Sequence, residues 1–374
     1  MSSVMASIAA TVHPHQIEIQ DFDVYDLIVD ARPVREYTLD RLPGAVNLPL
    51  APLRPRSAHG DAEAEDIGAA RSASDRPGSL SQQLRLNKLV CHLKPGALVL
   101  VYCSNSGRDS EVWARCLEEM GFSVDVLAGG WPVYRDWVTQ GLERLPRYMT
   151  LQGFTAAPMG GLDTVVRELV AEGEQVLVLD WIGADGGAPG FAWPWVRRVP
   201  QPRFESMLLD ALRHQDASRP VWVGWCWPSR QGLQLPPPVV AALAKRPALA
   251  VMSPAQLREQ AWRRLLESIH AEPSQGARAM GINQLRRGVE RAGDSLGVAP
   301  EEMASLLELV PDALAEVPTD AARRFAEVFD TPCVATIDGV ESLRVDLPSR
   351  ESAVVAKMLG QFRALCDLSR VGQA

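Results

Sequence analysis

The feature that most constrains this chain is an alternation between short, continuous apolar segments and longer amphipathic segments. The clearest apolar segment, Ala97-Leu-Val-Leu-Val-Tyr102, predicts a strand that is buried on both faces, as in a parallel sheet. A helical pattern follows over 110–120, and another apolar segment follows at 124–127. A further helix is expected over 133–140. Repeated units of this kind predict an α/β fold, in which helices cover a parallel sheet.

The same alternation begins again with a strand expected over 148–152, which indicates more than one domain in the 374 residues. From residue 255 the helical period dominates, apart from a hairpin signal at Asp338-Gly339 between strands expected at 333–337 and 342–346. We therefore predict an N-terminal α/β domain over 1–147 and a second α/β domain over 148–254. A helical region over 255–374, with a small hairpin, is expected to pack on the second domain.

One segment of the first domain lacks apolar periodicity. Residues 51–85 are rich in Ala, Ser, Asp, Arg and Pro, a composition that cannot bury much apolar surface. We interpret this segment as a surface loop.

Composition narrows the class of protein. The chain has 38 Lys and Arg against 46 Asp and Glu, a net charge of -8. This balance argues against a protein whose whole surface coats nucleic acid, but it is compatible with a local basic groove. The apolar segments are too short to span a bilayer, and no basic region precedes the apolar patch near the N-terminus. Six cysteines without a C-x-x-C pair indicate free thiols and no metal site. We expect a cytoplasmic protein without a membrane partner.

Cys103 follows the strand at 97–102 and opens a loop that leads directly into a helix. Backbone N–H groups at a helix N-terminus favour negative charge, so a thiol placed there is readily deprotonated and nucleophilic. Arg108 could add a positive charge. The alternative is a buried structural cysteine at a strand end. We predict Cys103 and Arg108 as catalytic residues, within an active-site loop whose other members are Ser104, Asn105, Ser106, Gly107, Asp109 and Ser110.

Several motifs over residues 22–140 resemble those of rhodanese domains. The first is an Asp-x-Arg followed by Glu-Tyr, and the second is Pro-Gly-Ala-x-Asn-Leu-Pro at 43–49. The loop that begins at Cys103 and the Ala-Gly-Gly-Trp sequence at 128–131 complete the set. The resemblance implies a rhodanese fold with a persulfide-forming Cys103 and a structural motif made of Asp30, Arg32 and Glu36. Arg41 stands where these domains commonly carry His.

The order of the remaining segments resembles the tRNA 2-selenouridine synthase family. A strand, a G-x-T loop and a helix follow the first domain, with further matches at 203–205 and 218–223. Members of that family replace sulfur by selenium at C2 of the wobble 2-thiouridine of tRNA. The resemblance implies a second domain of P-loop type, tRNA as substrate, and selenophosphate or a persulfide as donor, with a possible donor protein.

The second domain departs from that family where a P-loop is expected. Met159 occupies the position of the phosphate-binding lysine, Gly160 replaces the hydroxyl residue, and Pro158 removes a backbone donor. Each loss costs a bound phosphate on the order of 1–3 kcal/mol. We therefore predict a degenerate P-loop that binds neither nucleotide nor prenyl diphosphate, with these marker residues: Gly153, Thr155, Met159 and Gly160.

The leading hypothesis is a sulfur or selenium transferase that acts through Cys103 on tRNA. One alternative is a catalytically impaired relative that serves as an RNA- or protein-binding module, and another is a simple rhodanese sulfurtransferase. Six tryptophans in the second domain could stack on RNA bases, but core packing is the simpler explanation because Trp is usually well buried.

Overall fold

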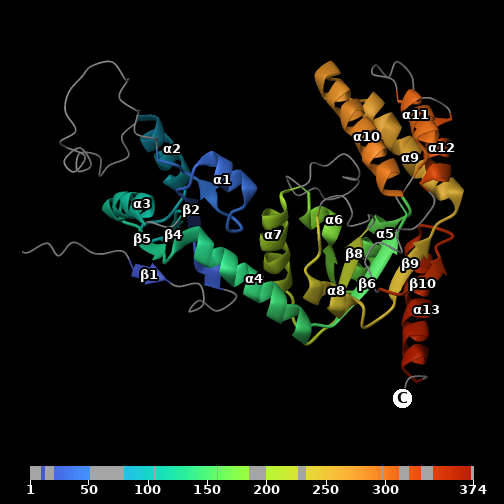
Figure 1. Cartoon of the computed structure of the whole chain (residues 1–374), viewed down its shortest axis with the longest axis horizontal. Coiled ribbons are helices and arrows are strands. Elements are labelled where there is room, and N and C mark those ends of the chain that lie inside the picture. The colour runs from blue at the N-terminus through green and yellow to red at the C-terminus, as the bar shows by residue number, and fades with distance from the viewer. Residues whose placement is uncertain are drawn as a thin grey trace, which may run out of the picture. The chain divides into compact units, whose positions relative to one another are not determined.

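The computed structural model divides into two compact units, Met1–Gly141 and Leu142–Ala374 (Figure 1). Both units are α/β with parallel sheets, which confirms the predicted fold class. The structure describes the following residues: 10–12, 21–50, 80–104, 107–157, 159–184, 199–225, 233–296, 298–310, 320–329 and 340–371.

The first unit contains a five-stranded sheet in the order β1-β5-β4-β2-β3, with every neighbouring pair parallel. Its most buried strand is β4, whose Val99, Leu100 and Val101 are fully excluded from solvent. The strands are β1 (Ala10–Val12), β2 (Leu27–Asp30), β3 (Val46–Asn47), β4 (Leu98–Tyr102) and β5 (Ser123–Leu127).

The helices of the first unit are a 3-10 turn, η1 (Asp21–Val24), followed by α1 (Val34–Leu39), α2 (Leu80–Val90), α3 (Arg108–Glu119) and α4 (Gly130–Tyr148). The core joins the sheet to α2 and α3, through Leu86 from α2 and through Trp113 and Leu117 from α3. These contacts fix α3 against the sheet directly after β4.

Two expectations for the first unit need correction. The segment interpreted as a surface loop over 51–85 ends in helix, because α2 begins at Leu80 and buries one face through Gln82, Leu86 and Val90. Residues 51–79 lie outside the described ranges. The helix expected at 133–140 is longer, because the stripe of buried residues formed by Tyr134 and Val138 continues at four-residue spacing to Leu142.

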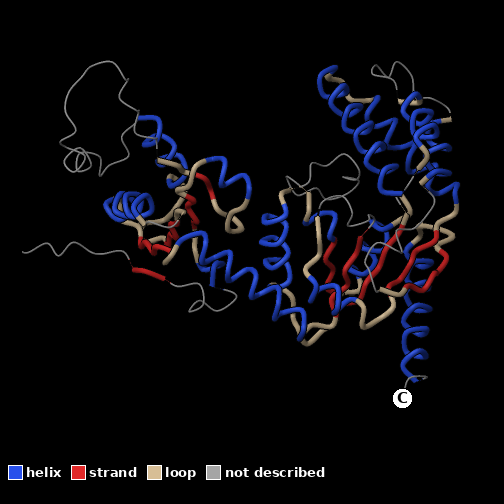
Figure 2. The backbone as a smooth tube through the Cα atoms, in the orientation of Figure 1, coloured by secondary structure: helices blue, strands red, loops and turns tan. Residues whose placement is uncertain are grey.

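The second unit contains a second five-stranded parallel sheet, in the order β10-β9-β6-β8-β7 (Figure 2). The C-terminal strand lies at the sheet edge, with Ser342 to Asp346 in register with Ala248 to Met252. The partner expected for it in a hairpin, at 333–337, lies outside the described residues. The strands are β6 (Leu151–Ala156), β7 (Gln175–Val178), β8 (Val221–Trp225), β9 (Ala248–Met252) and β10 (Ser342–Asp346).

Helices α5 and α13 contribute to one core with this sheet, in which Phe154, Leu249 and Phe362 are buried. A second core lies among the helices that follow β9, around Trp262, Phe325 and Phe329. The helices are α5 (Leu162–Ala171), α6 (Leu179–Ile182), α7 (Gln201–Arg213), α8 (Pro237–Leu243), α9 (Ala255–His270), α10 (Gln275–Leu296), α11 (Pro300–Glu308), α12 (Ala321–Val328) and α13 (Ser352–Val371).

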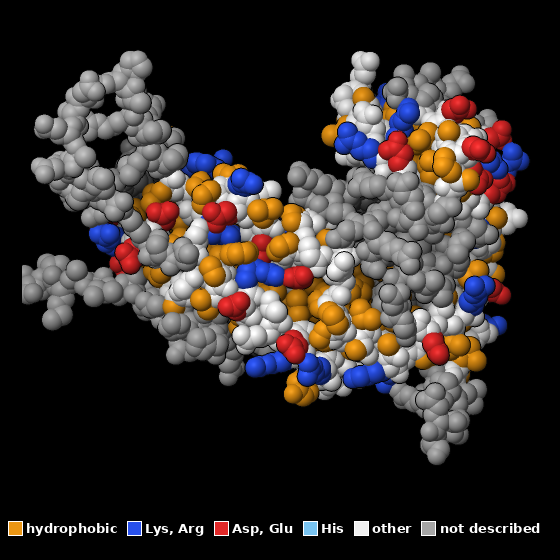
Figure 3. Space-filling view, viewed as in Figure 1, with side chains coloured by type: hydrophobic (Ala, Val, Ile, Leu, Met, Phe, Trp, Pro, Cys, Tyr) orange, Lys and Arg blue, Asp and Glu red, His pale blue; other side chains and the backbone are white. Residues whose placement is uncertain are grey.

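The surface carries both signs of charge. On the face drawn in Figure 3, Lys and Arg side chains are interspersed with Asp and Glu side chains over the described residues. Within the described ranges, every helix falls short of the length and apolar character that a membrane span requires.

Candidate active site at the carboxyl end of β4

Cys103 follows β4 directly, and the loop after it ends at Gly107, the N-cap of α3. Gly107 has a φ of 76°, a left-handed conformation that suits glycine. Cys103 is buried, and its Sγ lies 3.4 Å from Oγ of Ser110 in the first turn of α3. Ser110 Oγ also donates a hydrogen bond to the carbonyl oxygen of Gly107 at 2.7 Å. The thiol is therefore linked through Ser110 to the last residue of its own loop.

The first two residues of α4 fix the backbone of Cys103. The N–H of Trp131 donates to the carbonyl oxygen of Cys103 at 3.0 Å. Gly130 has a φ of 61°, and a Cβ atom added to it would overlap that same carbonyl oxygen. Only glycine fits this close approach, which explains the Gly-Gly-Trp sequence.

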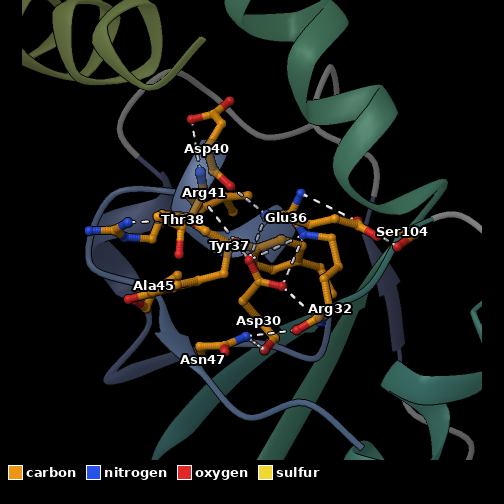
Figure 4. Close-up of polar contacts among 12 residues, drawn as sticks. Asp30, Arg32, Glu36, Tyr37, Thr38, Asp40, Arg41, Ala45, Asn47 and Ser104 are labelled. Atoms are coloured by element: carbon orange, nitrogen blue, oxygen red, sulfur yellow. Dashed lines mark hydrogen bonds and ion pairs between the residues drawn. The ribbon is translucent and has the colours of Figure 1, made fainter. Parts of the chain in front are cut away.

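A buried ion pair supports the same region from β2. Arg32 Nη2 lies 2.6 Å from Asp30 Oδ2 and also donates to the carbonyl oxygen of Asp40 at 2.6 Å (Figure 4). The guanidinium stacks over the rings of Tyr102 and Trp131, at 5.4 and 5.0 Å from their centroids. Burial alone would lower the pKa of Arg32, but the hydrogen bond and charge of Asp30 outweigh it, so the pKa is raised.

Tyr102, the last residue of β4, connects this ion pair to the strand before Cys103. Its hydroxyl donates to Asp30 Oδ2 at 2.6 Å and accepts the N–H of Leu42 at 3.1 Å. Burial, and then the negative charge of Asp30, raise the pKa of Tyr102 well above its ordinary value. Tyr102 is therefore neutral at physiological pH.

Glu36 connects the ion pair to the loop. Its Oε2 accepts a hydrogen bond from Ser104 Oγ at 2.9 Å and lies 4.0 Å from Arg32 Nη1 (Figure 4). The structure thus brings together the three predicted motif residues, Asp30, Arg32 and Glu36. No sequence signal indicated the bond between Glu36 and Ser104, because the two residues are 68 positions apart.

The other residues predicted for this loop are described less completely. Asp109 lies in the first turn of α3, and Arg108 begins that helix. The side chain of Arg108 and the whole of Asn105 and Ser106 lie outside the described parts of the chain.

The second predicted site, between β6 and α5, is built differently. Gly153 and Thr155 lie within β6 itself rather than in the loop. A Cβ atom on Gly153 would stand 2.8 Å from the ring of Trp225 and 3.1 Å from Ala248, so this glycine permits strand packing. Thr155 is fully buried, and its hydroxyl has no hydrogen-bond partner among the described residues.

Met159, at the position of the expected lysine, holds its loop against the core of the second unit. Its side chain is 8% exposed and belongs to the core around Trp262, and its φ is 58°. Its carbonyl oxygen accepts a hydrogen bond from Arg350 Nη2 at 2.6 Å, and the carbonyl of Gly160 accepts one from Ser253 Oγ. This loop is therefore bound to neighbouring parts of its own chain.

Charge around this loop is mainly basic. Burial lowers the pKa of Arg350; the negative charge of Asp163 opposes this, while Arg264 and Arg167 reinforce it. Of the tryptophans considered for RNA stacking, Trp222 and Trp225 are buried in the core. Those at 193, 195 and 227 lie outside the described residues.

With this geometry in place, the class of the first unit is clear. Residues 15–136 match the sequence model of the rhodanese-like domain family, so the chain contains a rhodanese-like domain. Curated relatives then narrow the comparison, because two of them are named tRNA 2-selenouridine synthase. The protein of Nitrosomonas europaea is 23% identical over 201 residues, 52% of each chain. That of Nitrosomonas eutropha is 22% identical over 144 residues, 38% of this chain and 37% of its own.

These matches confirm the resemblance to this family at the level of distant similarity, and the chain spans about half the length of the curated relatives or less. Among solved structures, Bacillus anthracis CoADR-RHD is 18% identical, covers 36% of this chain and 18% of its own, and has a TM-score of 0.23. The BH2092 protein of Bacillus halodurans is 15% identical, covers 34% and 73%, and has the same TM-score of 0.23.

Proposed function

We propose that this protein is a sulfur or selenium transferase that uses Cys103 and acts on the wobble 2-thiouridine of tRNA. One observation carries the proposal. In a rhodanese-like domain, the Cys103 thiol stands at the N-terminus of α3 and contacts Ser110. The names of the two curated relatives support a tRNA substrate, and the family resemblance of the sequence implies the wobble 2-thiouridine. A tRNA substrate in turn favours a cytoplasmic location.

The proposed first step loads Cys103. Its thiolate attacks the outer sulfur of a donor, the bond within the donor breaks, and the remainder of the donor leaves as a thiolate or sulfite. Backbone N–H groups at the start of α3 stabilise the negative charge on the sulfur that Cys103 has gained. Ser110 can rotate its hydroxyl from the carbonyl of Gly107 toward the anionic sulfur.

A persulfide, free or bound to a donor protein, is the donor consistent with this loading step, because it releases a thiolate when its outer sulfur is attacked. Selenophosphate does not load Cys103 in this way: its P–Se bond breaks to give phosphate and selenide, so it would serve as the source of selenide that replaces the sulfur of the thiouridine. We propose no role for a nucleotide or a prenyl diphosphate at the loop that contains Met159. The packing of Met159 and the bonds of Arg350 and Ser253 to the loop carbonyls support this choice.

The decisive experiment is mass spectrometry of tRNA nucleosides from cells in which the gene is deleted. Reintroducing the wild-type gene should change the ratio of 2-thiouridine to 2-selenouridine, whereas Cys103→Ser should not. Cys116→Ser is the matched control, since this residue lies in the same helix as Ser110, about two turns further on. Unchanged wobble nucleosides in the deletion strain would refute the proposed tRNA activity.

A simple sulfurtransferase is the second candidate. The loop at Met159 favours the simple sulfurtransferase, because it offers a phosphate no lysine and no hydroxyl residue and its Met159 side chain is buried in the core. Transfer of sulfur from Cys103 to a small thiol, together with unchanged wobble nucleosides, would select this candidate.

A further inference from the structure

Both ends of the loop after Cys103 carry a carboxylate. At the beginning, Glu36 from α1 accepts the hydrogen bond of Ser104 at 2.9 Å. At the end, Glu111 Oε1 lies 3.4 Å from the point where a Cβ atom on Gly107 would stand. The two side chains come from different helices, α1 and α3, and meet at one short loop.

Arg32 compensates the charge of Glu36 only in part. The guanidinium is engaged with Asp30 through Nε at 3.0 Å and through Nη2 at 2.6 Å, whereas its distance to Glu36 is 4.0 Å. The side chain of Glu36 is 44% exposed, so its carboxylate also contacts solvent. The two carboxylates therefore place negative charge at both ends of the loop, and their repulsion of a donor grows with the negative charge of that donor.

We infer that Glu36 and Glu111 make Cys103 selective for sulfur donors of low negative charge, that is, persulfides of thiols, over dianionic donors. This inference rests on the proposed function, because it names the donor class of the same cysteine. The reaction is balanced with either donor. The thiolate takes the outer sulfur, and the donor leaves as a thiol after protonation or as sulfite.

The test compares single-turnover loading of Cys103 by thiosulfate, a dianion, and by the persulfide of 2-mercaptoethanol, which carries at most one negative charge. Intact mass detects the gain of one sulfur atom. Glu36→Gln and Glu111→Gln should each raise the loading rate with thiosulfate about three- to tenfold, and should change the rate with the persulfide less than about twofold. Added salt should narrow the difference between donors in the wild-type protein.

Two control variants test whether the carboxylate charge beside the loop, and not the hydrogen bond or a distant charge, changes the loading rates. Ser104→Ala removes the hydrogen bond but keeps the carboxylate of Glu36, so the ratio of the two loading rates should stay near the wild-type value. Glu143→Gln changes an exposed carboxylate in α4 and should alter neither rate. Loading by both donors with a ratio that neither glutamine substitution changes would overturn the selectivity and leave the proposed function standing. Failure of every donor to load Cys103 would overturn both.

Discussion

The two units share a junction of strand, loop and helix, but the loop is lined by different groups in each. In each, a central parallel strand leads into a short loop, and a glycine in the left-handed conformation caps the next helix, Gly107 before α3 and Gly161 before α5. In the first unit the loop begins with the thiol of Cys103. In the second unit the loop is anchored by Met159, whose side chain is buried among α9 and α12. A strand, loop and helix junction therefore does not define a site until the groups that line it are known.

The largest effect is expected at the first junction. Cys103→Ser should lower sulfur transfer on the order of a thousandfold or more, because the attacking atom is lost. In peptide mapping after alkylation at neutral pH, Cys103 should react before Cys91, although Cys91 is exposed and Cys103 is buried. Faster labelling of Cys91 would show that the start of α3 does not activate the thiol.

The buried ion pair beneath that junction should contribute the next largest effect. Asp30→Asn leaves the buried guanidinium of Arg32 without its counter-charge and should lower the free energy of unfolding by about 3–5 kcal/mol. The matched control is Glu143→Gln, which removes an exposed pair with Arg147 and should cost at most about 1 kcal/mol. Urea titrations measure both. Equal effects would mean that Asp30 is not needed to hold β2 and β4 together.

The second junction offers the converse test. Met159→Lys restores the residue expected of a P-loop but places a charge in an apolar core, so the second unit should lose at least about 2 kcal/mol. Calorimetric titration with ATP, GTP and a prenyl diphosphate should detect no binding to this variant or to the wild type. Met159→Leu keeps the apolar volume and serves as the control. Micromolar binding of any of these three ligands by the wild type would contradict the interpretation that the loop at Met159 binds no phosphate.

The smallest effect concerns pH. Tyr102 has a raised pKa in the folded protein, so above pH 10 the unfolded chain loses a proton that the folded chain retains. The unfolded state then binds fewer protons, and stability should fall by about 1.4 kcal/mol per pH unit. Tyr102→Phe should remove this contribution. Stability curves of the two proteins from pH 8 to pH 11 with the same slope would refute the assignment.

The sequence predicted the parts of the fold that depend on local pattern. The strand before Cys103 and the helix after it were found because a continuous apolar segment and an amphipathic one follow each other. The three-residue strand β1 was missed, since so short a segment has no measurable period. The start of β6 was expected at Tyr148, whereas α4 extends to that residue because its buried stripe continues past Gly141.

For the candidate sites too, the sequence predicted what local motifs carry and missed the contacts between distant segments. Motifs pointed to Cys103, Asp30 and Glu36 from the sequence alone. Contacts that join distant segments could not be read from it, such as those of Arg350 with Met159 and of Glu36 with Ser104. These contacts depend on tertiary packing, for which no local spacing gives a signal.

The place of β10 at the edge of the second sheet bears on how the protein is made. The sheet of the first unit has all its strands once Leu127 has left the ribosome, whereas β9 waits for a partner that lies near the C-terminus. At about 5–20 residues per second, that interval lasts on the order of 5–20 s. During it the edge of β9 presents unpaired N–H and C=O groups to other chains. We expect a nascent second unit to depend on chaperones far more than the first.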